Sequence, residues 1–199
     1  MILRALATLF LVGLLGLNLA LPSTSIGRRG PEARVRSDVE SELLVGERLP
    51  PLRLVDLDGR EVTREDLLGH RVLLVFERSV DWCPFTKARL VELRQAFEQT
   101  PDLRIVWVMS EAQMNERSRV FIDELGLAQR ILFLADPQSR LIRELGILKD
   151  DPERIEVGVP HPTTLLLDRT GTIRFVDVRE DYHLWLDPEA LEDALARLD

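Results

Sequence analysis

Two uninterrupted apolar runs constrain the fold of this chain more than any other feature of its sequence. They are Val-Leu-Leu-Val-Phe at 72–76 and Ile-Val-Trp-Val at 105–108. Runs of this kind are typical of strands that are covered on both faces of a sheet. Between them, the apolar residues of segment 90–97 recur at helical spacing. A buried strand, a helix and a second buried strand predict a parallel sheet with helices on its faces.

The same alternation continues towards the C-terminus. An apolar helical pattern at 120–125 precedes a third strand at 131–134, which we expect near an edge of the sheet. The apolar residues of 141–145 then predict a short helix. A last helix is predicted to begin at Pro188, with Asp187 as its N-cap.

Two hairpins complete the predicted sheet. The first joins strand-like segments at 52–55 and 61–62 through an Asp-Gly turn, and the second joins 163–167 to 172–176 through a tight loop. Together the segments predict an α/β fold in which a central mixed β-sheet is flanked by helices on both faces. The first hairpin is an N-terminal β-hairpin extension of that sheet.

An uncharged apolar run from Ala5 to Leu21 predicts a signal peptide or an N-terminal membrane anchor, which we assign to 1–22. At about 1.5 Å per residue the run spans about 26 Å, slightly short of the ~30 Å of a bilayer core, so its length fits cleavage and anchoring alike. Segment 23–45 is predicted as a linker and 46–199 as the folded domain. We therefore expect an exported protein, periplasmic or otherwise extracytoplasmic, that is either released or anchored in the membrane.

The composition argues against several classes of partner and site. The 199 residues carry a formal net charge of −8, which disfavours nucleic acid as a partner because the chain would repel phosphate. The single cysteine rules out an intrachain disulfide. Three scattered histidines, His70, His161 and His183, lack the spacing of a metal site, so we expect no metal and no cofactor.

The lone cysteine, Cys83, lies where the first buried strand gives way to a helix that Pro84 can start. Unpaired N–H groups and the positive end of the helix dipole favour an anion at this position, so the thiol should ionise more easily than a free cysteine. Lys87 adds to this effect, whereas Glu77 and Asp81 oppose it. Without such a context, a single cysteine is more often a small buried hydrophobic residue.

The segment Trp82-Cys83-Pro84-Phe85-Thr86, the hairpin before it and the later His161-Pro162-Thr163 resemble the thioredoxin superfamily. Within it, the resemblance is to the peroxiredoxin-like branch, the alkyl hydroperoxide reductase/thiol-specific antioxidant (AhpC/TSA) family, over about residues 46–198. It implies a thioredoxin-like fold in which Cys83 is the reactive cysteine. It also implies that Pro162 is cis and packs beside this thiol.

Three departures from the family pattern concern the chemistry. Thr86 occupies the place of the second, resolving cysteine. Val80 and Pro162 stand where typical peroxiredoxins have a Thr or Ser and an Arg, and Ser79 offers a hydroxyl one residue early. We predict a catalytic set and a substrate-binding set; for Trp82 taken alone, core packing is the default interpretation. The catalytic set is Cys83, Thr86 and Pro162, and the substrate-binding set is Trp82, Pro84 and His161.

Two functions compete at this stage. The first is a thiol-based redox protein with an antioxidant role, acting as a single-cysteine peroxidase or a thiol–disulfide oxidoreductase. Its substrate would be a peroxide or a protein disulfide, and an external thiol reductant, or Cys83 of a second copy, would complete the cycle. The alternative is a non-catalytic thioredoxin-fold binding module that has lost the resolving cysteine.

Overall fold

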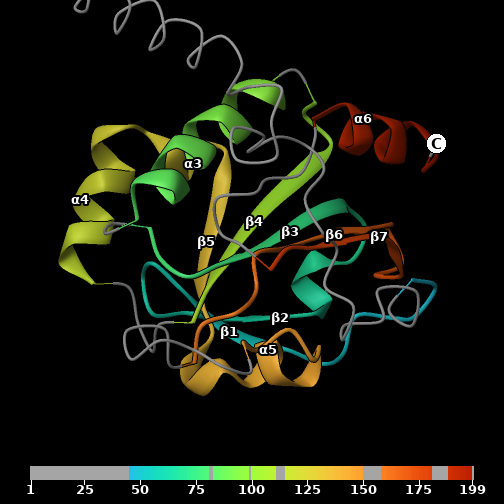
Figure 1. The fold of residues 1–199 in the computed structure, drawn as a ribbon, viewed down its shortest axis with the longest axis horizontal. Helices are drawn as coiled ribbons and strands as arrows, with labels where there is room; N and C mark the ends of the chain where they lie inside the picture. The colour runs from blue at the N-terminus through green and yellow to red at the C-terminus, as the bar shows by residue number, and fades with distance from the viewer. Residues whose placement is uncertain are drawn as a thin grey trace, which may run out of the picture.

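A mixed seven-stranded sheet forms the centre of the molecule (Figure 1). The computed structural model describes residues 45–80, 83–98, 100–110, 115–149, 158–180 and 188–198. Within these ranges the strand order is β2-β1-β5-β4-β3-β6-β7. The strands are β1 (Arg53–Asp56), β2 (Glu61–Thr63), β3 (Arg71–Glu77), β4 (Leu103–Met109), β5 (Ile131–Ala135), β6 (Thr163–Leu167) and β7 (Ile173–Val178). The predicted mixed sheet and α/β fold class are confirmed.

The two long apolar runs are neighbours at the centre of the sheet. Strands β3 and β4 pair in parallel, with Phe76 opposite Val108, and every residue of β3 is buried. Strand β4 pairs in parallel with β5 as well, so three consecutive strands run in one direction. Their carboxyl ends therefore meet at one edge of the sheet, where the segment after β3 leads to Cys83.

The expected edge position of segment 131–134 needs a correction. Strand β5 is the third strand of the sheet, because β1 pairs antiparallel with it and places Val55 opposite Ala135. The hairpin of β1 and β2 was predicted correctly as a local unit. Its partner strand is set by tertiary packing, and a local pattern of turn residues carries no information about that partner.

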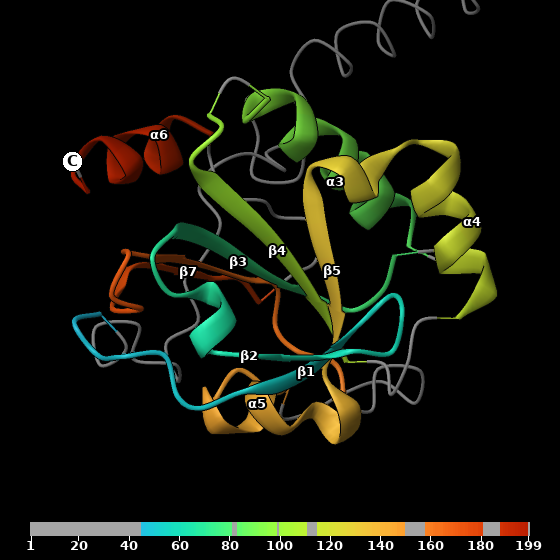
Figure 2. The same ribbon diagram turned by 180° about the vertical axis from the view of Figure 1, so that it is seen from behind.

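Helices cover both faces of the sheet. The α-helices are α3 (Pro84–Ala96), α4 (Glu116–Glu124), α5 (Arg140–Glu144) and α6 (Pro188–Ala196), and three short 3₁₀ helices are η2 (Glu65–Leu67), η3 (Leu127–Gln129) and η4 (Pro137–Ser139). Figures 1 and 2 show α3, α4 and α6 on one side of the sheet and α5 on the other. Each side has its own apolar cluster, one with Trp107 and Ile122 and the other with Phe76 and Ile142.

Several predictions from the sequence fall outside the described residues. These are the leader at 1–22, the linker except its last residue, Trp82, Asp81, His183 and the Asp187 cap. Among the residues that the structure does describe, no helix combines the length and apolar character needed to cross a membrane.

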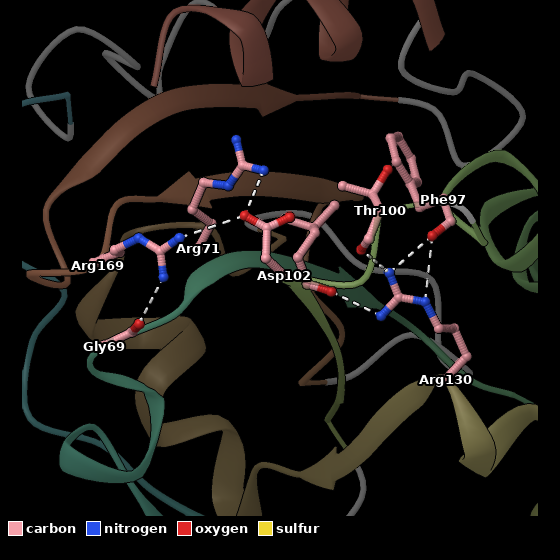
Figure 3. Close-up of polar contacts among 8 residues, drawn as sticks. Gly69, Arg71, Phe97, Thr100, Asp102, Arg130 and Arg169 are labelled. Atoms are coloured by element: carbon pink, nitrogen blue, oxygen red, sulfur yellow. Dashed lines mark hydrogen bonds and ion pairs between the residues drawn. The ribbon is translucent and has the colours of Figure 1, made fainter. Parts of the chain in front are cut away.

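Polar side chains connect several segments at the amino ends of β3 and β4, the end of the sheet far from Cys83 (Figure 3). Arg130 donates to the backbone carbonyls of Phe97, Thr100 and Leu103, with N–O distances of 2.6 to 3.3 Å. Asp102 accepts from Arg71 at 2.7 Å and from Arg169 at 3.4 Å. These contacts join the start of β3, the start of β4 and the β6–β7 turn. Their role is structural.

The β6–β7 turn is built around one carboxylate, Asp168. Its Oδ1 accepts from the backbone N–H groups of Thr170 and Thr172 and from the Thr170 hydroxyl, and its Oδ2 accepts from Arg174 Nε at 2.7 Å. Partial burial opposes ionisation, but these hydrogen bonds outweigh it and lower the pKa of Asp168 to about 2. The charged carboxylate therefore stabilises the folded hairpin.

We predict that Asp168→Ala lowers the free energy of unfolding by about 1–2 kcal/mol at neutral pH. Because the folded pKa is depressed from 3.8 to about 2, the contribution is complete above about pH 5 and is lost progressively as the pH falls towards 2. Urea unfolding of both proteins at several pH values measures the difference. Asp58→Ala, in the exposed β1–β2 turn, is the matched control and should change stability by less than about 0.5 kcal/mol. A difference that is constant with pH would contradict the prediction.

Candidate active site

Cys83 is the N-cap residue of α3, in an extended conformation, and Pro84 follows at the first helical position. The Lys87 N–H donates to the Cys83 carbonyl at 3.2 Å, which closes the first turn of the helix. The Cys83 side chain is fully buried. The predicted junction of buried strand and helix N-terminus is therefore present, and it holds the sulfur against the interior of the protein.

Two residues act on the sulfur. Arg78 Nη2 donates to Cys83 Sγ at 3.2 Å, and Thr86, three residues further along α3, also lowers the pKa of the thiol. Burial is the largest single influence on the thiol and raises its pKa, but the hydrogen bonds from Thr86 and then from Arg78 outweigh it. The net effect is a pKa of Cys83 below its ordinary value. The site favours a thiolate, which is the nucleophilic form of cysteine.

Two buried ion pairs lie at the same end of the sheet. Arg89 of α3 donates to Glu77 Oε1 at 2.7 Å, and Arg179 pairs with Asp177 at 2.6 Å. All four side chains are less than a tenth exposed. Burial raises the pKa of both carboxyls, although Arg89 and Arg179 oppose the shift. The acidic residue expected to oppose ionisation of Cys83, Glu77, thus has a guanidinium partner of its own.

Thr86 of α3 contacts this charged group. Its side chain is buried, one turn into α3, and its Oγ1 donates to Glu77 Oε2 at a long 3.5 Å. Thr86 also lowers the pKa of the Cys83 thiol. At the place of a resolving cysteine, the chain therefore has a buried hydroxyl that faces a carboxylate.

Pro162 lies near Arg78, the residue that contacts the sulfur. Pro162, Glu77 and Arg78 line one small cavity of about 10 Å³. The Pro162 carbonyl accepts from the backbone N–H of Arg179 at 2.9 Å. The expected cis bond before Pro162 is wrong: among the described residues there is no cis peptide bond. The expectation came from the family resemblance, whereas about 94% of X–Pro bonds in folded proteins are trans.

The other predicted substrate-binding residues differ in their surroundings. Pro84 is exposed at the start of α3. His161 is buried. Its ring Nδ1 lies 3.3 Å from the Arg179 carbonyl oxygen, and its backbone N–H donates to the Ile147 carbonyl. His161 is thus held by backbone groups behind Pro162, and Trp82 lies outside the described residues.

The structure shows where the residues that depart from the family pattern lie. Val80 is buried in the apolar cluster beneath α3. Ser79 is buried too, and its hydroxyl makes no hydrogen bond within the part of the chain that the structure describes. The cation absent from the expected position is supplied by Arg78, which sequence reasoning missed. A charged pair directly after a buried strand, Glu77-Arg78, was the signal that could have found it.

The sequence and the fold together identify the family. Residues 45–176 match the model of the AhpC/TSA family. The chain belongs to the AhpC/TSA family. Among curated proteins no sequence match is found.

Solved structures of AhpC/TSA-like proteins show the same fold. A peroxiredoxin-like protein from Aquifex aeolicus has a TM-score of 0.68 at 14% identity, over 78% of this chain and 87% of its own. A thiol peroxidase from Chromobacterium violaceum has a TM-score of 0.66 at 21% identity, over 83% and 91%. AhpC from Enterococcus faecalis has a TM-score of 0.62 at 18% identity, over 77% and 91%. The thioredoxin-like fold is confirmed, and family membership supports a thiol-based redox function of the oxidoreductase class.

We predict that Arg78→Met raises the pKa of Cys83, because a guanidinium in contact with the sulfur stabilises the thiolate. The rate of alkylation by iodoacetamide as a function of pH reports this pKa. Arg78→Lys, which keeps the positive charge, should shift the profile less. An unchanged profile in Arg78→Met, with the circular dichroism spectrum of the parent, would show that Arg78 has no effect on the thiol.

Proposed function

We propose that this AhpC/TSA protein is a single-cysteine thiol peroxidase with an antioxidant role. The observation that carries the proposal is the contact between Arg78 and the buried sulfur of Cys83, reinforced by Thr86. Guanidinium and hydroxyl donors stabilise the thiolate before any substrate arrives. An arginine beside the sulfur can also donate to the oxygen atoms of a peroxide as it reacts.

In the proposed reaction, the Cys83 thiolate attacks one oxygen of the peroxide and the O–O bond breaks. The sulfur becomes a sulfenic acid, and the other oxygen takes a proton and leaves as water or an alcohol. An external thiol then condenses with the sulfenic acid to give a mixed disulfide and water. A second thiol displaces Cys83, which regenerates the enzyme and releases an oxidised disulfide.

Burial favours a peroxide over a protein disulfide as the oxidant. The Cys83 side chain has no exposed surface, so a substrate must be small enough to reach the sulfur between the groups that surround it. A protein disulfide brings a bulky chain to the thiol, whereas a peroxide brings two bonded oxygen atoms. The competing binding module requires an unreactive thiol, which the hydrogen bonds to the sulfur disfavour.

We expect Cys83→Ser to lose peroxide consumption completely, since a serine hydroxyl is far less acidic than a thiol and the chain has no other cysteine. Stopped-flow measurement of peroxide loss with excess dithiothreitol tests this on the full chain. A thiol probe specific for sulfenic acid should label the parent and not the variant. Peroxide consumption that survives in Cys83→Ser would refute the proposed enzyme.

A second prediction concerns Thr86, which lies three residues after Cys83 at the start of α3. Thr86→Cys places a thiol at a spacing where helical side chains are neighbours, so oxidation should produce an intramolecular disulfide. Mass spectrometry should show a loss of two hydrogens in the variant, whereas the parent stops at the sulfenic acid or an external adduct. Thr86→Ser is the control and should behave as the parent. If the two thiols of Thr86→Cys never pair, the thioredoxin-like placement of the site is wrong.

A further inference from the structure

A cavity of about 420 Å³ lies at the amino ends of β4 and β5, far along the sheet from Cys83. Within the described part of the chain, β1 pairs with β5 at Val55↔Ala135 and Asp56↔Leu134 and no further. The chain then turns towards β2, so segment 131–133 of β5 has no β1 residue paired with it. The cavity lies in this gap, and its volume is in the range of small-molecule sites.

Two arginines line the cavity, and they differ in how many of their donors are used. Arg130 donates to the carbonyls of three residues (Figure 3), so most of its N–H groups are engaged. Arg104 Nη1 donates to the Asp66 carbonyl at 2.7 Å, and its Nη2 lies 3.1 Å from His70 Nε2. A guanidinium has five N–H donors. Arg104 therefore keeps donors for a ligand, whereas Arg130 contributes mainly its charge.

The ring of His70 adds another donor to the cavity lining. An arginine nitrogen can only donate, so His70 Nε2 must accept the hydrogen bond from Arg104. The ring in this contact is thus neutral, with its proton on Nδ1. His70 and Arg104 both line the cavity and both carry N–H groups, which are the groups that recognise an anion.

The carboxylates of the lining differ in how far their charge is compensated. Asp102 is compensated from outside the cavity, because Arg71 and Arg169 both pair with it. Asp58 of the β1–β2 turn has Arg60 at 3.8 Å. Asp56 accepts with Oδ1 from the backbone N–H groups of the same turn, which are neutral. Asp56 is therefore the lining carboxylate whose charge has no cation beside it within the described residues.

The remaining charges of the lining favour a single negative charge on the ligand. Arg104 and Arg130 are two cations whose contacts are carbonyls and a neutral imidazole, and Asp56 is one anion. One further negative charge neutralises the three. A dianion leaves a negative charge in excess, and its removal from water costs more than that of a monoanion.

We propose that this cavity binds a monocarboxylate with an apolar body. The carboxylate accepts from Arg104 and His70, since the planar guanidinium matches the geometry of a carboxylate. The apolar body packs against Leu57 and Leu132, which line the cavity and are half-buried against the two apolar clusters of the protein. The site shares no residue with the surroundings of Cys83, so the inference is independent of the proposed function.

Isothermal titration calorimetry of the full chain with octanoate tests the proposal. Octanamide has the same apolar body without the charge, and octyl phosphate is a dianion at pH 8. We expect octanoate to bind about ten-fold or more tightly than octanamide, because hydrogen bonds to a charged group are lost in the amide. Octyl phosphate should bind more weakly than octanoate. Absence of octanoate binding, equal binding of octanamide, or tighter binding of octyl phosphate would overturn the proposal.

The variant Arg104→Met tests the location of the site. It should weaken octanoate binding about ten-fold or more and leave octanamide binding unchanged, since only the anion uses the guanidinium. Arg94→Met is the matched control, because Arg94 also donates to a backbone carbonyl, at 2.6 Å, but lies outside the cavity. It should bind octanoate as the parent does. Parent-like octanoate binding in Arg104→Met would show that the ligand lies elsewhere.

A second variant strengthens binding and so does not depend on the folding of Arg104→Met. Asp56→Asn keeps the side-chain oxygen that accepts from the turn and removes the charge that faces the ligand. Octanoate binding should tighten about two-fold and octyl phosphate binding about five-fold, because a dianion gains twice as much from the loss of one repelling charge. Unchanged affinities for both ligands would contradict the proposed position of the carboxylate. Cys83→Ser should bind octanoate as the parent does, whatever its peroxide consumption.

Discussion

A buried ion pair joins the end of the central strand β3 to the helix that carries the reactive thiol. Glu77 and Arg89 are both less than a tenth exposed, and their side chains are 2.7 Å apart. Removal of one partner from such a pair leaves an uncompensated charge in the interior and costs about 3–5 kcal/mol. The pair therefore fixes how α3 sits against β3, and with it the position of Cys83. This contact therefore links β3 to the helix whose N-cap is the reactive cysteine.

The position of α3 explains why a single thiol can be ionised inside a protein. Burial alone would keep Cys83 neutral, and it is the largest single influence on its pKa. The helix N-terminus and the Thr86 N–H compensate from one side of the sulfur, and Arg78 does so with a guanidinium. The chain thus has a cation beside the sulfur although Pro162 occupies the expected position of the arginine. The same electrostatic requirement is met from a different place in the fold.

The parts of this structure that depend on local patterns could be read from the sequence. Continuous apolar runs identified β3 and β4, and proline after cysteine identified the start of α3, because burial and backbone geometry act over a few residues. The position of β5 inside the sheet could not be read, since it depends on which strand the β1 hairpin joins. The contact of Arg78 with Cys83 could not be read either, because it is a side-chain contact that no local pattern of residue types specifies.

The replacement of a resolving cysteine by Thr86 has two physical consequences that act together. Without a second thiol, the oxidised sulfur cannot form a disulfide within the chain, so reduction must come from another molecule. A cysteine at this position would compete for the place beside Cys83 and would be a poor hydrogen-bond donor. A hydroxyl there is a stronger donor: Thr86 donates to Glu77 at 3.5 Å and lowers the pKa of Cys83. The residue that replaces the resolving thiol therefore favours the thiolate form of the remaining one.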